Sequence, residues 1–340
     1  MFTTVSDILR LVSRDHQAEN GVSSHESRDD EIIIIATVFL IISYIAVGLR
    51  LWARSISKAG VKLDDCLNIF ALFLSTIFTV ITIKSVEYGT GKPRASVSDE
   101  DFSSWFKIAY VSRIIYPLPI TAVKLSVLLL YRRLFPVDSF RLTLKINGAI
   151  IIAWMLAVIL GSIFSCIPIQ NAWLAGTPHA RCLDMKIFQL ALGSINILTD
   201  IVLVALPLPF VWRLNVPAAQ KVQLVALLST GGLVCAVSCV RVYYVGKMSK
   251  INLDPTWNHS NLTIWTVVEI CMTIVSACLP TLRPLFVNNN WRGSEHGSET
   301  AIFEPYERPP TQIQVARSWE VTTTQKNSVN AETASGHSMA

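Results

Sequence analysis

Charged side chains occur inside stretches of this sequence that are otherwise apolar and long enough to cross a lipid bilayer. They are Arg113, Lys124, Asp200, Arg241 and Glu269. A charge at the centre of a bilayer costs about 2.5 to 3.5 kcal/mol on insertion scales unless it faces other helices or a polar cavity. We therefore expect these side chains to point into a helix bundle, where they pair with one another or act on a ligand, a substrate or a proton.

The segment 187–212 carries the clearest polar pattern. Gln189, Gly193, Asn196 and Asp200 follow one another at intervals of four, three and four residues, which places them on one face of a helix. Asp200 lies about thirteen residues into the segment, roughly 20 Å along a helix that rises 1.5 Å per residue. This depth is near the middle of a membrane, so Asp200 is the first candidate for a functional carboxylate.

A second polar stripe, which includes Glu269, runs along one face of the last apolar segment. Glu269 matches Arg113 and Arg241 in depth, which predicts an outer cluster of these three residues. The long side chain of Lys124 predicts a deeper pair with Asp200. Two interpretations stay open, a pocket that binds a small ligand or moves a proton and a set of buried ion pairs that fix helix register. The ligand-pocket candidates are Arg113, Lys124, Asn196, Asp200, Arg241 and Glu269.

The composition indicates a membrane protein. Hydrophobic residues make up 51% of the 340 residues, charged residues only 16%, and the mean hydropathy is +0.46. We predict an all-α fold, a bundle of seven transmembrane helices over 32–286. The expected spans are 32–49, 66–83, 106–130, 146–164, 187–212, 222–245 and 262–286. The net charge of +5 belongs to the loops of such a protein, and we expect no nucleic-acid partner.

The third span lies in the stretch 106–135, which we expect at the centre of the bundle. Arg113 and Lys124 are eleven residues apart, about three turns, so a continuous helix presents both on one face together with Pro117 and Tyr131. The opposite face is composed of Leu, Ile and Val. One polar stripe therefore turns inward.

Cations in the short loops predict the orientation. The loops after spans one, three and five are the more basic, and the positive-inside rule places them in the cytoplasm. Residues 1–31 then form an extracellular segment, and 287–340, rich in Ser, Thr, Asn, Glu and Pro, form a disordered cytoplasmic tail. The basic inner loops would contact a cytoplasmic signalling partner. Their cations are Arg50, Arg54, Lys58, Lys62, Arg132, Arg133, Arg141, Lys145, Arg213 and Lys221.

Two cysteines bracket the expected external loop between spans four and five. In an oxidising compartment Cys166 and Cys182 would form a disulfide. Glycosylation sequons precede the seventh span at Asn258 and Asn261, of which Asn258 is the better acceptor because Asn261 lies so close to the membrane.

Before the second span stand Asp64 and Asp65, which we interpret as helix-capping carboxylates rather than metal ligands. All six histidines fall outside the expected spans, and the seventh span has no lysine to form a retinal Schiff base. We expect neither a metal nor a cofactor.

Several motifs together resemble the fungal rhodopsin-like seven-span proteins, the family named for a satratoxin-cluster membrane protein and related to fungal surface-sensing receptors. The resemblance covers about 32–286, and it implies a seven-span shape without a chromophore. Where this family often has Gly-x-Gly-x-His, the chain reads Gly89-Thr90-Gly91-Lys92-Pro93, so a role carried by that histidine is not expected. The matching motifs are RLWAR (50–54), LDD (63–65), KLSVLLLYRRLF (124–135), CIPIQNAW (166–173) with Cys182, TDIVLVALPLPFVWRL (199–214), IWTVVE (264–269) and ACLPTLRPL (277–285).

Three functions follow from the residues and the resemblance. The first is a receptor-like sensor in the plasma membrane or an internal membrane, with a small lipophilic ligand in an outer cavity. The resemblance also implies that such a protein is encoded with a secondary-metabolite cluster. The second is a membrane enzyme of biosynthesis, with Asp200, Glu269 and Lys124 as acid, base or electrostatic groups acting on a lipophilic intermediate. The third is a transporter, which ranks last because no internal repeat is visible.

Overall fold

The computed structural model describes residues 28–56, 60, 62–134, 138–168, 170, 181–208, 218–247 and 255–282. These residues belong to one compact unit, Met1–Asn288. The tail 287–340 and nearly all of the segment 1–31 lie outside the described residues, so the disorder of the tail and the extracellular position of the N-terminal segment stay predictions.

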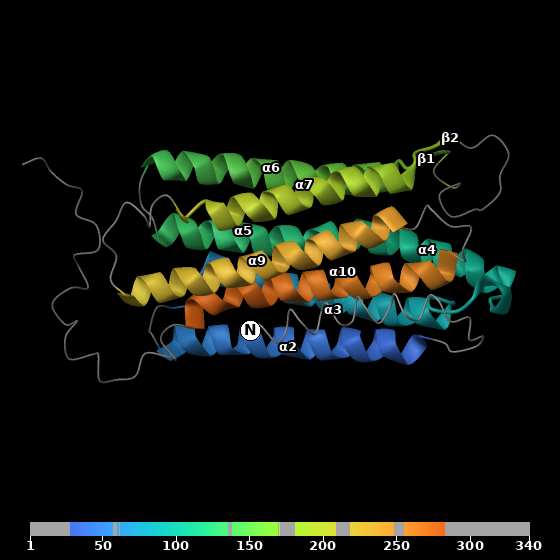
Figure 1. Cartoon of the computed structure of the whole chain (residues 1–340), viewed down its shortest axis with the longest axis horizontal. Coiled ribbons are helices and arrows are strands. Elements are labelled where there is room, and N and C mark those ends of the chain that lie inside the picture. The colour runs from blue at the N-terminus through green and yellow to red at the C-terminus, as the bar shows by residue number, and fades with distance from the viewer. Residues whose placement is uncertain are drawn as a thin grey trace, which may run out of the picture. The chain divides into compact units, whose positions relative to one another are not determined.

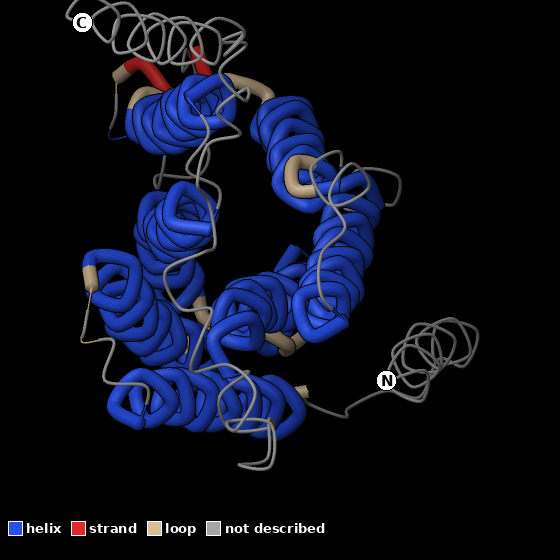
Figure 2. The backbone as a smooth tube through the Cα atoms, turned by 90° about the vertical axis from the view of Figure 1, so that its left-hand side faces the viewer, coloured by secondary structure: helices blue, strands red, loops and turns tan. Residues whose placement is uncertain are grey.

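The described part of the chain is almost entirely helical (Figure 1). Seven of its helical segments are long and apolar enough to cross a membrane. The helices are α2 (Asp29–Ile56), α3 (Leu63–Glu87), α4 (Asp99–Ile115), α5 (Pro117–Leu134), α6 (Asp138–Ile163), α7 (Met185–Ala205), α9 (Ala218–Lys247) and α10 (Pro255–Cys278), with 3-10 turns η1 (Arg94–Ser96) and η3 (Leu279–Leu282). They lie side by side, and Figure 2 shows them nearly end-on.

Large apolar side chains point away from the bundle. Ile34 on α2, Phe73 on α3 and Leu160 on α6 each expose half or more of their surface, while many polar side chains, Lys124 and Glu269 among them, are buried inside. Water would penalise this arrangement, whereas hydrocarbon favours it, because only the inside offers hydrogen-bond partners. The pattern agrees with a membrane setting for the seven helices.

The third span consists of two helices. α4 begins at Asp99 with Ser98 as its N-cap, whose hydroxyl accepts a hydrogen bond from the Asp101 amide. The helical hydrogen-bond ladder lapses after Tyr116, because Pro117 has no N–H to donate, while the backbone of Tyr116 itself stays helical with φ −47° and ψ −47°. The two helices form one membrane-spanning segment, Asp99–Arg133, which contains the span expected over 106–130, with Arg113 on α4 and Lys124 on α5.

The expected end of the fifth span, Trp212, lies outside the described residues, and the described helix of this span is α7. α7 stops at Ala205, just before Pro207. Proline cannot donate to the Leu203 carbonyl, and the hydroxyl of Tyr131 on α5 donates to that carbonyl instead, at 3.2 Å. The helix end is thus satisfied by a side chain from its neighbour.

The centre of the bundle is α10 together with α5. α10 packs against α2, α3, α5 and α9 (Figures 1 and 2), and its span is the most deeply buried of the seven. The stretch 106–135, expected to be central, is second in burial. α6 lies farther out and contacts α4, α5 and α7.

A short hairpin closes one end of the bundle. β1 (Cys166–Ile167) after α6 pairs antiparallel with β2 (Arg181–Cys182) before α7. The two cysteines form a disulfide with an S–S distance of 2.03 Å, which confirms the predicted pairing. We call this the disulfide end; the opposite end is where α2 ends and α3 begins.

Small residues allow α7 and α9 to approach closely. A Cβ atom added to Gly231 on α9 would lie 2.3 Å from the Cγ2 atom of Val204 on α7. Valine has little rotamer freedom in a helix, so the helices themselves would have to separate. At the next residue, Gly232, an added Cβ would meet nothing within 4 Å.

This contrast predicts a difference between two neighbouring alanine substitutions. Gly231→Ala should lower thermal stability, by about 1 to 3 kcal/mol as for other overpacked interiors, despite the better helix propensity of alanine. Gly232→Ala gains the same propensity without the clash and should be neutral or stabilising. Thermal unfolding of both purified variants in one detergent measures the difference; equal midpoints would show that α7 and α9 do not touch at Gly231.

Candidate functional site

Four of the five predicted charged residues meet in the middle of the bundle. We call this group the central network. It draws on the junction of α4 and α5, and on α5, α7, α9 and α10. Its members are Tyr116, Lys124, Asn196, Thr199, Asp200, Ser238, Arg241 and Glu269, all of them buried.

Lys124 on α5 is held almost entirely by α7. Its Nζ atom lies 2.9 Å from Oδ1 of Asp200 and donates to the side-chain oxygens of Asn196 and Thr199, both at 2.8 Å. The ammonium is 2% exposed, and its donors are all satisfied. The expected deep pair of Lys124 with Asp200 is confirmed.

Glu269 on α10 is the most densely bonded carboxylate of the network. It accepts hydrogen bonds from the hydroxyls of Tyr116 at 2.7 Å and Ser238 at 2.6 Å, and from the Asn196 amide at 3.2 Å. Nε of Arg241 lies 2.7 Å from Oε2. That contact is an ion pair without hydrogen-bond geometry, because the N–H is not directed at the oxygen. The expected pairing of Arg241 with Glu269 is also confirmed.

The outer and deeper groups form one network instead of two. Asn196 links them, because its amide donates to Glu269 while its oxygen accepts from Lys124. Ser238 adds a second link, with its hydroxyl 2.6 Å from Glu269 and 3.5 Å from Asp200. Sequence reasoning missed Ser238, although it stands three residues before Arg241 and so on the same face of α9.

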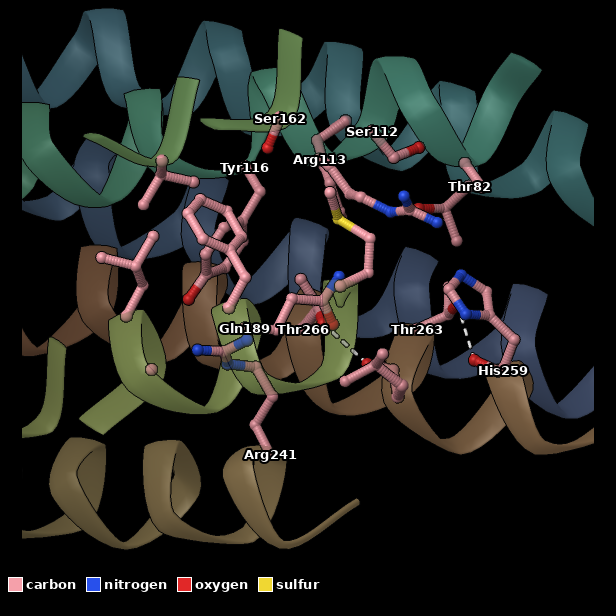
Figure 3. Close-up of a pocket in the computed structure, with 18 of the residues that line it drawn as sticks. Thr82, Ser112, Arg113, Tyr116, Ser162, Gln189, Arg241, His259, Thr263 and Thr266 are labelled. Atoms are coloured by element: carbon pink, nitrogen blue, oxygen red, sulfur yellow. Dashed lines mark hydrogen bonds between the residues drawn. The ribbon is translucent and has the colours of Figure 1, made fainter. Parts of the chain in front are cut away.

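A cavity opens beside the central network toward the disulfide end (Figure 3). It encloses about 900 Å³, including its open mouth. Aromatic side chains from four helices form much of its wall, and Tyr116 and Arg241 connect it to the network. The lining residues used below are Phe78, Trp105, Arg113, Tyr116, Trp154, Phe188, Gln189, Leu192, Arg241 and His259.

Arg113 lines this cavity and is not part of the central network. Its buried Nε atom has no hydrogen-bond partner among the described residues. The prediction that Arg113 joins Arg241 and Glu269 is therefore wrong. Tyr116, three residues further along the chain, contacts Glu269 in its place.

His259 also lines the cavity, which corrects the prediction that every histidine lies outside the spans. α10 begins at Pro255, earlier than expected, so His259 lies in the membrane-spanning stretch His259–Leu282. Its ring contacts Trp105 edge to face at 5.2 Å. No group of three His, Cys, Asp or Glu side chains that could hold a metal occurs within the described ranges.

A second cavity lies on the other side of the central network. Its lining includes Lys124, Asp200, Tyr131 and Thr273, and it has a volume of about 530 Å³ with its mouth. Along α10 the first cavity reaches Thr266 and the second begins at Thr273, with Glu269 between them. The central network is thus a charged layer between two cavities.

The acidic pair before span two does more than cap its helix. Asp65 accepts a hydrogen bond from the Lys62 amide at 3.1 Å, as expected of a cap. Both carboxylates also pair with Arg50, whose NH2 and Nε atoms lie 2.7 Å from Asp64 and Asp65 respectively, and Arg54 contacts both. This arginine–aspartate cluster corrects the interpretation of Asp64 and Asp65 as caps alone.

Both sequons lie within the first turns of α10 and not in a loop. The Asn261 side-chain oxygen accepts a hydrogen bond from Arg28 at 2.8 Å. Asn261 is therefore engaged in the fold, and glycosylation at Asn258 stays a prediction.

A bundle of seven membrane-spanning helices with an internal cavity and a buried charge network defines a seven-helix membrane protein with a ligand-sized site. The chain belongs to the fungal rhodopsin domain family, whose family model matches residues 49–288.

The relatives include proteins named as a receptor, as a biosynthesis gene cluster protein and as a SAT4 family membrane protein. The chain is 26% identical to Receptor GIN3 of Arthrobotrys oligospora, over 76% of this chain and 62% of the receptor. It is 30% identical to the polyenoic acids biosynthesis gene cluster protein Ba17b of Metarhizium anisopliae, over 74% of this chain and 72% of that protein. It is 31% identical to a SAT4 family membrane protein of Emericella nidulans, over 62% of this chain and 53% of that protein. No solved structure matches the chain.

Proposed function

We propose that this protein is a receptor-like sensor that binds a small lipophilic ligand in the disulfide-end cavity and reports it at the opposite end. The observation that carries the proposal is that the central network touches both cavities. Tyr116 and Arg241 line the first cavity, and Lys124 and Asp200 line the second. A ligand that moves Tyr116 or Arg241 changes the contacts of Glu269. Asn196 and Ser238 then transmit that change to Lys124 and Asp200.

Such coupling requires that a ligand bind two arrangements of the bundle with different affinity. The junction of α4 and α5 provides a place for the two arrangements to differ, because Pro117 removes one helical hydrogen bond there and Tyr116, beside it, bonds directly to Glu269. In this proposal the disulfide end faces out of the cell, and the basic segments of the opposite end contact a signalling partner. The similarity to Receptor GIN3 supports the assignment.

A remote reporter tests the coupling. A fluorophore is placed at an Arg133→Cys substitution, at an exposed position near the end of α5, after the exposed Cys66 and Cys239 are replaced by serine. A panel of lipophilic acids, alcohols and esters is then screened in nanodiscs. We expect compounds that bind the wild-type cavity to change the emission at position 133.

The Ser238→Ala substitution should separate binding from response. It removes one link between Glu269 and Asp200 without touching the cavity wall, so binding should stay within about twofold while the remote change of emission is largely lost. Ser194→Ala is the matched control, because the hydroxyl of Ser194 is exposed and bonds only within its own helix. An unaltered response in Ser238→Ala would contradict the sensor proposal.

A membrane enzyme is the second candidate, since relatives are named for biosynthetic clusters and both Lys124 and Asp200 border the second cavity. An enzyme should produce a lipophilic compound in a null fungal host that disappears with Asp200→Asn at equal protein abundance. Identical metabolite profiles would favour the sensor.

A further inference from the structure

We propose that the disulfide-end cavity binds an organic anion, an oxyanion on an apolar body, and that Arg113 is the residue that contacts the oxyanion. The inference rests on the cavity named in the proposed function and specifies its ligand. It begins with the charge balance of the bundle interior.

The other inward-facing cations of the described spans have carboxylate partners. Arg50 and Arg54 pair with Asp64 and Asp65. Lys124 and Arg241 likewise pair with the two carboxylates of the central network. Arg113 departs from this rule.

No described carboxylate lies within ion-pair distance of Arg113, and its Nε atom is buried without a hydrogen-bond partner. A desolvated guanidinium without a counter-charge is costly, and evolution rarely keeps one in a span without a function. Its planar fork of donors fits a carboxylate or a phosphate, which accepts two parallel hydrogen bonds. A ligand anion would supply the missing charge.

Arg113 is the charged side chain in the described wall of the cavity that lacks a counter-charge, because Arg241 pairs with Glu269 at 2.7 Å. Arg241 and His259 join Arg113 in the lining, and no aspartate or glutamate is part of it among the described residues. Arg113, Arg241 and His259 enter the space from α4, α9 and α10 (Figure 3). A neutral or cationic ligand would leave the Arg113 guanidinium without a counter-charge.

The rest of the wall suits an apolar body. Phe78, Trp105, Trp154, Phe188 and Leu192 form the apolar part of the wall. Aromatic and aliphatic side chains of this kind bury hydrocarbon, while the few polar groups orient the ligand. A free lipophilic acid and an anionic membrane lipid share this chemistry, and the experiment distinguishes them.

The test uses the full-length protein in nanodiscs of neutral phosphatidylcholine. The probe is a long-chain fatty acid that carries a diazirine and a terminal alkyne, and the neutral comparison is its methyl ester. Cross-linked peptides are located by mass spectrometry. We expect the acid to label the segments 105–116 and 259–266, and the ester to label them about tenfold less or weaker still, the loss typical of a charged hydrogen bond.

Three variants sharpen the result. Arg113→Gln should reduce labelling by the acid to the level of the ester, whereas Arg113→Lys should keep part of it. Lys107→Gln removes an exposed cation from the same helix and should change nothing. The comparison of acid with ester on the wild-type chain needs no substitution. It therefore tests the preference of the cavity for an anion even where a variant folds poorly.

Two competitors of the probe and one further variant, Leu192→Trp, complete the design. Displacement of the probe by oleate but not by phosphatidic acid identifies a free acid as the ligand; the reverse identifies a membrane lipid. If acid and ester label equally and Leu192→Trp blocks both, the cavity takes neutral ligands, which overturns this inference and leaves the sensor proposal standing. Labelling outside the cavity overturns it as well.

Discussion

Replacing Glu269 with glutamine is expected to lower the free energy of unfolding by about 3 to 5 kcal/mol, the range measured when one partner of a buried ion pair is removed. Glu269 is 1% exposed and accepts from Tyr116, Ser238 and Asn196 while it neutralises Arg241. Glutamine keeps the shape of the side chain but leaves the Arg241 guanidinium buried without a counter-charge. Unfolding in a nanodisc, monitored by steric trapping, measures the loss of free energy of unfolding.

A second substitution identifies the source of that loss. In Glu269→Gln/Arg241→Met the lone charge is gone, so we expect the double variant to be more stable than Glu269→Gln alone. Glu87→Gln is the control, because Glu87 pairs with Lys84 on an exposed face of α3 and should leave stability unchanged. If the double variant is no more stable than the single one, Arg241 is solvated and the central network is not a charge-balanced unit.

The Lys124–Asp200 pair predicts a related symmetry. Lys124→Ala and Asp200→Asn each leave one buried charge, so the two should destabilise the protein to a similar extent. If Lys124→Ala leaves the free energy of unfolding unchanged, the Lys124–Asp200 pair does not stabilise the bundle.

The second large effect is expected at the opposite end of the bundle. Arg50→Met should lower the free energy of unfolding by about 3 to 5 kcal/mol, because Arg50 is 1% exposed and binds Asp64, Asp65 and the Ala277 carbonyl at 2.7 Å each. One guanidinium therefore ties α2 to α3 and α10. Without it, two adjacent buried carboxylates share only Arg54.

Arg50→Lys should recover part of the loss and not all of it. An ammonium supplies the charge, but it lacks the planar set of donors that reaches two carboxylates and a carbonyl together. Arg133→Met, at an exposed site, controls for the removal of an arginine. Thermal unfolding and surface expression measure the series. Equal stability of the lysine and wild-type proteins would mean that charge alone holds this end.

Much of the fold follows from the sequence because the bilayer imposes local rules. A long apolar segment must be helical in hydrocarbon, and the chain has seven of them. Depth follows from the rise of 1.5 Å per residue, which is why Lys124 could be matched with Asp200, and Arg241 with Glu269. The disulfide of Cys166 with Cys182 follows from the position of both at the ends of one loop.

The residues that sequence reasoning misplaced depend on the relation between helices. Arg113 matches Glu269 in depth, but depth does not say which cation faces the carboxylate, and Arg241 and Tyr116 are the residues that meet it. Asp64 and Asp65 have the local pattern of caps, and their pairing with Arg50 exists only because α2 and α3 lie together.

The sequence by itself determined the membrane setting, the helical class and the charges that needed partners, because each depends on the properties of one segment in hydrocarbon. Only the tertiary structure decided which charges are partnered. The rotation of each helix about its axis is set by packing with its neighbours, and it places Ser238 and Tyr116 against Glu269 and leaves Arg113 facing the cavity.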